Sequence, residues 1–156
     1  MTLKHLDTLK FVAKVIPPNC SWMVVGSMSC RLQGMDWDPN DVDILTTKKD
    51  FSVFKKKLAQ YLVKKKIEEK KGLVEQEFLI NDVVISVFYE FNSGIVYTPF
   101  LKQGFIKMSL IDGVKVPLLW LEKEAKAYRK ANRLKKAQVK AQAIEKHLKR
   151  RSRGNG

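Results

Sequence analysis

The chain has 156 residues, of which 45% are hydrophobic and 29% are charged, and 30 Lys and Arg against 16 Asp and Glu give a net charge of +14. This length fits one folded domain and is too short for two ordinary ones. The hydrophobic content argues against wholesale disorder. The apolar runs fall short of the about 20 residues that cross a bilayer, and the N-terminus lacks the apolar core of a secretory signal. Cys20 and Cys30 make neither a disulfide framework nor a metal cluster, so we expect a cytoplasmic protein with reduced thiols and no membrane contact.

The positive charge is concentrated towards the C-terminal end of the sequence. Residues 121–156 hold 13 Lys and Arg and 3 Asp and Glu, a net charge of +10, so residues 1–120 carry the remaining +4. Such an excess favours anionic partners. We therefore interpret residues 121–149 as a basic, phosphate-facing helix that is attached to a mildly basic core.

The first elements along the chain are predicted to alternate between helix and strand. Apolar residues at three- and four-residue steps predict an amphipathic helix over 3–16, which two prolines end. A short apolar run over 22–25 ends in Gly26–Ser27, which predicts a strand, a tight turn and a short helix closed by Gly34. A turn-rich segment then precedes a second strand over 41–45.

Hydrophobic periodicity divides the rest of the chain into a helix, a group of strands and a terminal helix. The predicted elements are a helix over 50–66, antiparallel strands over 73–80 and 83–91, two short strands flanking Asp112–Gly113, and a long basic helix from 119 to about 149. We expect residues 1–149 to form a single domain and residues 150–156 to be a flexible basic tail.

The segment from Val24 to Leu45 has the residues that point to chemistry. A glycine lets the backbone turn sharply and lets a phosphate come close, while backbone N–H groups at the helix start and the Ser27 hydroxyl can donate to phosphate oxygens. Asp41 and Asp43 are two residues apart on a strand, so their side chains point to one face and can hold hard cations such as Mg²⁺. The pattern predicts a site for a phosphate-bearing substrate and a divalent metal ion.

This segment resembles the nucleotidyltransferase signature of the DNA polymerase beta superfamily, in which Gly-[Gly/Ser] is followed at short distance by Asp-x-Asp. The residues that match its small stand-alone members are Val24, Val25, Gly26, Ser27, Leu32, Gly34, Asp41, Asp43 and Ile44. Trp37 and Pro39 stand where Arg and Thr are frequent. The resemblance implies an α/β (α+β) nucleotidyltransferase-like fold, a small mixed sheet flanked by helices, with a long basic C-terminal helix.

The resemblance also implies an activity. It implies an enzyme that binds a nucleoside triphosphate with Mg²⁺ or Mn²⁺ and transfers a nucleotidyl group to a hydroxyl of a protein, a small molecule or RNA. By resemblance, Asp41 and Asp43 would hold the metal and act in catalysis, while Gly26 and Ser27 would hold the β- and γ-phosphates. Further contacts to the nucleotide are assigned to Arg31, Lys126 and Arg133.

The third carboxylate of such sites is missing from its expected place. Relatives have it on a later strand, where it serves as metal ligand and general base, and Ser86 occupies that position here. Glu90, which lies four residues on and on the same strand face, and Glu77 on the partner strand are the candidates to replace it. The competing interpretation of both glutamates is that they are solvent-facing charges of the hairpin.

Ser86 also favours an alternative function, that of a catalytically degenerate protein that binds nucleic acid or a partner through its basic C-terminal helix. The residues assigned to that surface are Arg129, Lys130, Arg133, Lys136 and Lys140. A solvated helix that packs through its alanines is the competing interpretation. A third possibility, which some small relatives of this fold illustrate, is an antitoxin-like or adaptor role beside a helical partner protein.

Overall fold

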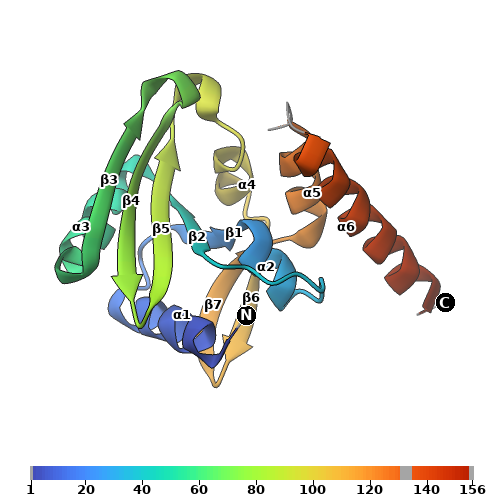
Figure 1. Ribbon diagram of the computed structural model, residues 1–156, viewed down its shortest axis with the longest axis horizontal. Helices are drawn as coiled ribbons and strands as arrows, with labels where there is room; N and C mark the ends of the chain where they lie inside the picture. The colour runs from blue at the N-terminus through green and yellow to red at the C-terminus, as the bar shows by residue number, and fades with distance from the viewer. Residues whose placement is uncertain (1, 131–134, 155–156) are drawn as a thin grey trace.

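The structure is a computed structural model that describes residues 2–130 and 135–154. Within these residues, helices surround a seven-stranded sheet (Figure 1). The α-helices are α1 (Leu3–Val15), α2 (Gly26–Leu32), α3 (Lys48–Lys57), α4 (Thr98–Lys102), α5 (Leu121–Lys130) and α6 (Lys135–Gly154). The strands are β1 (Trp22–Val25), β2 (Val42–Thr46), β3 (Leu62–Glu68), β4 (Leu73–Ile80), β5 (Val83–Glu90), β6 (Ile106–Ile111) and β7 (Val114–Leu119). The 3-10 turns are η1 (Ala59–Tyr61), η2 (Glu69–Lys71) and η3 (Asn92–Gly94).

The strands follow the order β3-β4-β5-β2-β1-β7-β6, and the sheet is mixed. The pairs β2/β5 and β1/β7 are parallel, whereas the other neighbouring pairs are antiparallel. One line of paired residues crosses the four central strands, from Val25 through Asp43 and Ser86 to Glu77. The predicted fold class is therefore confirmed, and the sheet brings the predicted polar residues into one line.

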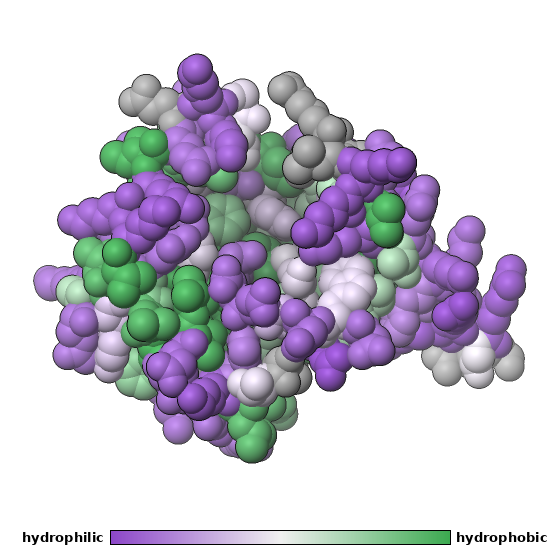
Figure 2. All heavy atoms as spheres, viewed as in Figure 1, coloured by the Kyte–Doolittle hydropathy of each residue, from purple (hydrophilic) through white to green (hydrophobic). Residues whose placement is uncertain are grey.

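The two faces of the sheet have different coverings. On one face, Val24 and Ile44 pack in a core with Leu9 of α1 and Phe54 of α3. On the opposite face, Met23, Val25 and Leu45 pack with Leu101 of α4. Residues on a strand alternate between faces, so Asp43 belongs to this second face. In Figure 2, hydrophilic side chains border a recess, with the β3–β4 edge on one side of it and α6 on the other.

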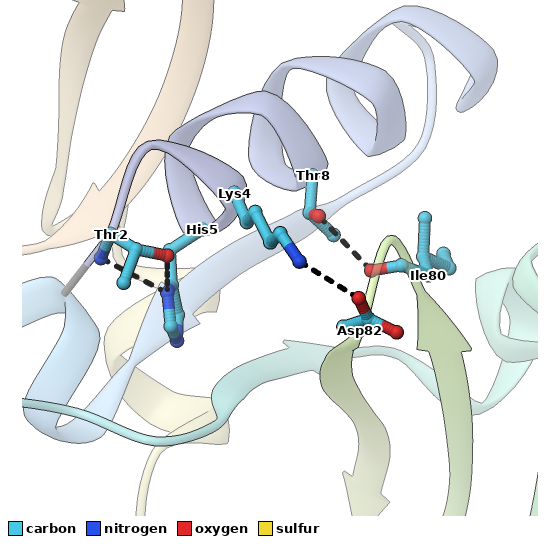
Figure 3. Close-up of polar contacts among 6 residues, drawn as sticks. All are labelled: Thr2, Lys4, His5, Thr8, Ile80 and Asp82. Carbon is cyan, nitrogen blue, oxygen red and sulfur yellow. Dashed lines mark hydrogen bonds and ion pairs between the residues drawn. The ribbon is translucent and has the colours of Figure 1, made fainter.

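Helix α1 is attached to the hairpin between β4 and β5 (Figure 3). The buried Thr8 hydroxyl donates to the carbonyl of Ile80 at 3.1 Å, and Lys4 Nζ lies 2.8 Å from Oδ2 of Asp82. The turn itself, Asn81–Asp82, has φ of +54° and +64°, which suits a two-residue hairpin and these residue types. The predicted hairpin is therefore confirmed.

The predicted helix over residues 50–66 is wrong in its second half. Helix α3 ends at Lys57, and residues 62–68 form β3, which pairs antiparallel with β4 at the edge of the sheet. The helical spacing of Tyr61 and Leu62 misled the prediction. Pairing with β4 satisfies backbone N–H and C=O groups that β4 would otherwise leave unpaired at an edge, and this tertiary gain outweighs local spacing.

The predicted single helix over 119–149 is also wrong, because two helices occupy that region. Nε of Arg129 on α5 lies 2.6 Å from Oε1 of Glu145 on α6, whereas residues this far apart on one continuous helix would be separated by about 24 Å. The return of the chain buries Ala141 and Ile144 completely, the latter against Leu121 and Ala125. The predicted tail is helical as far as Gly154. None of the helices described is both long and apolar enough to cross a membrane.

Candidate active site

The turn between β1 and α2 places Gly26 directly against Asp43. The φ of Gly26 is +73°, in the left-handed region that favours glycine. A Cβ atom at this position would lie 3.2 Å from Oδ2 of Asp43, tighter than an ordinary van der Waals contact. Glycine is therefore favoured here both by the backbone turn and by the close approach of the aspartate.

The Gly26 N–H is engaged by a carboxylate of α5, Glu124, which the sequence analysis missed. Gly26 N donates to Oε1 of Glu124 at 2.7 Å, and the Tyr97 hydroxyl lies 3.5 Å from Oε2. The Glu124 side chain is fully buried, and this burial raises its pKa well above the usual value, although the bond from Gly26 acts in the opposite direction. The expectation of free N–H groups at the helix start is therefore wrong for Gly26. The only sequence signal is a glutamate within the apolar stripe that contains Leu121 and Ala125.

Carboxylates from two strands surround Ser86. Asp43 on β2 pairs with Ser86 on β5, which pairs in turn with Glu77 on β4. The Ser86 hydroxyl donates a hydrogen bond to Oε1 of Glu75, which is two residues from Glu77 and therefore on the same face of β4. The serine that replaces the expected carboxylate is thus bonded to a carboxylate from the neighbouring strand.

The pKa of Asp43 reports this crowding. It is raised to about 6, first by burial and then by the negative charges of Asp41 and Glu75, while Lys140 acts to lower it. In residues 2–130 and 135–154 no three Asp, Glu, His or Cys side chains form a group arranged to hold a metal ion. Asp41 lies in an exposed bend just before β2 and Asp43 lies on β2 itself, so the metal pair expected from the sequence stays a prediction; Mg²⁺ usually completes such a pair with phosphate oxygens and water.

The two glutamates suggested by the sequence have other partners. Glu77 forms an ion pair with Lys66 at 3.6 Å. Glu90 Oε1 accepts hydrogen bonds from the backbone N–H groups of Tyr97 and Thr98, at 2.9 and 2.8 Å, and from the Thr98 hydroxyl at 2.7 Å. Glu90 therefore stabilises the start of α4. The carboxylate that the structure bonds to Ser86 is that of Glu75 and not that of Glu90. The signal that could have found Glu75 is its alternation with Glu77 on one strand face.

Lys140 of α6 reaches the turn after β1. Its Nζ donates to the Ser27 hydroxyl at 3.0 Å, and it lies 5.4 Å from the ring centroid of Trp37 and 5.5 Å from that of Tyr128. Its charge acts to lower the pKa of both Asp43 and Glu124. Lys140, which the sequence analysis assigned to a nucleic-acid surface, is therefore placed inside the candidate site.

The remaining predicted residues are dispersed. Arg31 donates to Oδ1 of Asp36 at 3.0 Å and to the carbonyl of Trp37 at 3.3 Å, so it holds the loop before β2. Arg129 is paired with Glu145 on its own helical hairpin. The other basic residues are Lys126 and Lys130, exposed on α5, Lys136, exposed on α6, and Arg133, which lies outside the described residues.

Comparisons with known proteins agree with this geometry at the level of the fold. No family model and no curated protein matches the sequence. TM1012 of Thermotoga maritima, described as a candidate nucleotidyltransferase, superposes with a TM-score of 0.74 at 22% identity over 96% of both chains. The lincosamide antibiotic adenylyltransferase LnuA, in its lincomycin-bound form, gives a TM-score of 0.59 at 10% identity over 93% of this chain and 96% of its own.

A third structure, ANT(2'')-Ia in complex with adenylyl-2''-tobramycin, gives a TM-score of 0.59 at 12% identity and covers 95% of this chain and 90% of its own. At these identities the likeness concerns the fold. The chain has the nucleotidyltransferase fold, and the resemblance inferred from residues 24–45 is confirmed at that level.

Proposed function

We propose that the protein binds a nucleoside triphosphate with Mg²⁺ or Mn²⁺ and transfers its nucleotidyl group to an acceptor hydroxyl. The observation that carries the proposal is the convergence of Asp43, Ser27 and Lys140, from three separate elements, around the Gly26 turn. LnuA is a lincosamide antibiotic adenylyltransferase, and ANT(2'')-Ia, an antibiotic-resistance factor, forms a complex with adenylyl-2''-tobramycin. Two proteins of this fold that act on such compounds support nucleotidyl transfer as the reaction.

Ser27 and Lys140 would hold the β- and γ-phosphates. Both are hydrogen-bond donors, and the partner of Lys140 is a neutral hydroxyl, so its positive charge remains available for a phosphate. The rings of Trp37 and Tyr128 flank the ammonium group and limit where it can move. A triphosphate at this turn would replace the bond between Ser27 and Lys140 with bonds from each of them to its oxygens.

Asp41 and Asp43 fit a divalent cation, because they offer the oxygen ligands that Mg²⁺ prefers and because a cation would offset the burial and the repulsion from Asp41 that raise the pKa of Asp43. The chemistry that bound Mg²⁺ supplies is neutralisation of the phosphate charge during in-line displacement. The carboxylate pair would hold that cation between the Ser27 turn and Ser86.

In this proposal Glu75 would accept the proton of the acceptor hydroxyl. Its Oε1 accepts a hydrogen bond from the hydroxyl of Ser86, the residue that occupies the strand position where a carboxylate is expected. In the proposed step the acceptor oxygen forms a bond to the α-phosphorus and its proton passes to Glu75. The bond from the α-phosphorus to the bridging oxygen breaks, and pyrophosphate departs with that electron pair on the side of Ser27 and Lys140.

The experiment is incubation with each of the four labelled nucleoside triphosphates and Mg²⁺ or Mn²⁺, across a panel of hydroxyl acceptors, for wild type, Asp41→Asn and Asp43→Asn. Asp112→Asn is the matched control, since Asp112 is exposed on the β6–β7 turn. We expect metal-dependent product from wild type and the control and none from the two site variants. Product or nucleotide binding that is equal in all four proteins would contradict the proposal.

A further inference from the structure

A pocket of about 490 Å³ opens next to Ser86 and Glu75, on the same face of the sheet. Phe88, which lines it, is two residues along β5 from Ser86 and pairs with Glu75 on β4. Its floor includes Phe88 and Tyr97, whose rings meet edge to face at a centroid distance of 6.3 Å. Its rim carries Lys70, Lys71 and Lys130. We call it the lysine-rimmed pocket.

Two interlocked turns, η2 and η3, build one wall of this pocket. The carbonyl of Gly72 accepts from Phe91 N at 2.8 Å, and a Cβ atom on Gly94 would lie only 2.1 Å from the carbonyl oxygen of Lys71. A Cβ atom on Gly72 would lie 2.2 Å from the carbonyl oxygen of Phe91. The two turns are in direct backbone contact, which only glycine allows at these two positions. This contact lets η2 present Lys70 and Lys71 at the pocket rim.

The charge of the pocket is positive. Within the described part of the chain the rim lysines have one ion pair, between Lys71 and Glu68 at 3.4 Å. Glu90, the acidic residue of the lining, is already engaged by three donors from Tyr97 and Thr98. Lysine ammonium groups above an aromatic floor suit a ligand that is planar in one part and anionic in another, as a nucleotide unit is.

The geometry of the proposed reaction assigns this pocket to the acceptor, and this step rests on the function proposed above. In an in-line displacement, the attacking hydroxyl and the departing pyrophosphate lie on opposite sides of the phosphorus. Ser27, which follows β1, and its partner Lys140 lie on one side of Asp43. Phe88 on β5 and Glu75 on β4 lie on the other side. The acceptor would therefore approach from the lysine-rimmed pocket.

We infer that the lysine-rimmed pocket binds the end of a single-stranded nucleic acid, whose terminal hydroxyl is the acceptor. Positive charge continues outside the pocket, with Lys64 exposed on β3 on the same face of the sheet as Glu77 and with Lys135 and Lys136 exposed on α6. Figure 2 shows hydrophilic side chains on both sides of the recess. A phosphodiester chain matches such an extended arrangement, because several phosphates can be neutralised at once.

The test is fluorescence anisotropy of a short 5′-labelled single-stranded RNA with the full-length protein, at about 50 and 200 mM salt. The double variant Lys70→Ala/Lys130→Ala removes two rim charges. The matched control, Lys56→Ala/Lys115→Ala, removes two exposed charges from α3 and β7. We expect affinity that falls steeply with salt, roughly a tenfold loss in the rim variant, and a loss within about twofold in the control. We also expect labelled nucleotide to extend RNA with a free 3′-hydroxyl and not RNA with a blocked end.

Three results would overturn the inference: no RNA binding at low salt, equal losses in the two double variants, or rim-dependent binding of ribose 5-phosphate that is tighter than that of RNA. Nucleotide binding that depends on Asp43 is measured in parallel and tests the proposed function separately. If that binding persists without RNA binding, only the acceptor inference fails. If RNA binding maps to the rim without any Asp43-dependent nucleotide binding, the proposed function fails and the ligand class of the pocket is supported.

Discussion

Lys140 Nζ donates a hydrogen bond of 3.0 Å to the hydroxyl of Ser27, across 113 residues of sequence. This bond joins the last helix of the chain to the turn that follows its first strand. The same ammonium group acts to lower the pKa of Asp43. The C-terminal helix is therefore a component of the candidate site, and the predictions below follow from that arrangement.

Lys140→Ala is expected to weaken nucleoside triphosphate binding by roughly tenfold or more, because a charge-assisted hydrogen bond contributes about 1.5–3 kcal/mol. Titration calorimetry with a non-hydrolysable triphosphate and Mg²⁺ measures the change. Lys146→Ala removes an exposed charge from the same helix and should bind like wild type. Equal weakening in the two variants would show that α6 acts only through its general charge.

Gly26→Ala is expected to lower the free energy of unfolding more than Gly104→Ala does. Both glycines have positive φ, +73° and +76°, so both substitutions carry the backbone strain of about 1 kcal/mol. Only at Gly26 does the added Cβ atom meet a neighbour, Oδ2 of Asp43 at 3.2 Å, whereas nothing lies within 4 Å at Gly104. Urea denaturation of the two variants measures the difference, and equal losses would contradict the close contact.

Glu124→Gln is expected to change the pH dependence of stability. The folded pKa of Glu124 is raised above its ordinary 4.5, so the folded state holds this proton more tightly than the unfolded state does. Its stabilising contribution is therefore complete below about pH 4.5 and is lost as the pH rises through the folded pKa. Glutamine keeps an acceptor for Gly26 and has no proton to lose. The variant should gain stability relative to wild type between pH 5 and pH 8.

Thermal unfolding across that pH range measures the change in Glu124→Gln. Glu122→Gln, an exposed position on the same helix, is the control and should follow the pH profile of wild type. A Glu124→Gln profile parallel to that of wild type would show that the proton affinity of this carboxyl is the same in the folded and unfolded states.

Glu75→Gln is expected to reduce the rate of nucleotidyl transfer by roughly a hundredfold or more, the scale of general base catalysis, with little change in nucleotide affinity. Glu77→Gln is the matched control on the same strand face, since Glu77 is paired with Lys66 and the Ser86 hydroxyl contacts Glu75. Single-turnover rates separate the chemical step from binding. Equal losses in the two variants would remove Glu75 from the proton transfer.

Local patterns in the sequence were enough to predict the elements around the site. The strand over 22–25, the turn at Gly26–Ser27 and the strand that contains Asp43 were all recognisable, because each depends on a few adjacent residues with distinct conformational preferences. The hairpin at Asn81–Asp82 belongs to the same class. A likeness to a known pattern then linked these elements to phosphate and metal chemistry.

The parts that could not be predicted depend on tertiary contacts. Strand β3 exists because it pairs with β4, and the α5–α6 arrangement buries Ile144 against residues more than 100 positions away, such as Cys30. Glu75 and Glu124 reach Ser86 and Gly26 through sheet register and helix packing, and the local spacing of these glutamates does not show which residues they contact. Lys140 looked like one of many surface lysines because the sequence around it is rich in lysine, and only the fold directs it to Ser27.

The most direct test of the central claim is a crystal structure of the protein with Mn²⁺ and a non-hydrolysable nucleoside triphosphate, with anomalous scattering used to locate the metal. We predict a manganese peak bound by the carboxylates of Asp41 and Asp43, with the β- and γ-phosphates on Ser27 and Lys140. A nucleotide bound away from the Gly26 turn, or phosphates at the turn with no manganese on Asp41 and Asp43, would contradict the account.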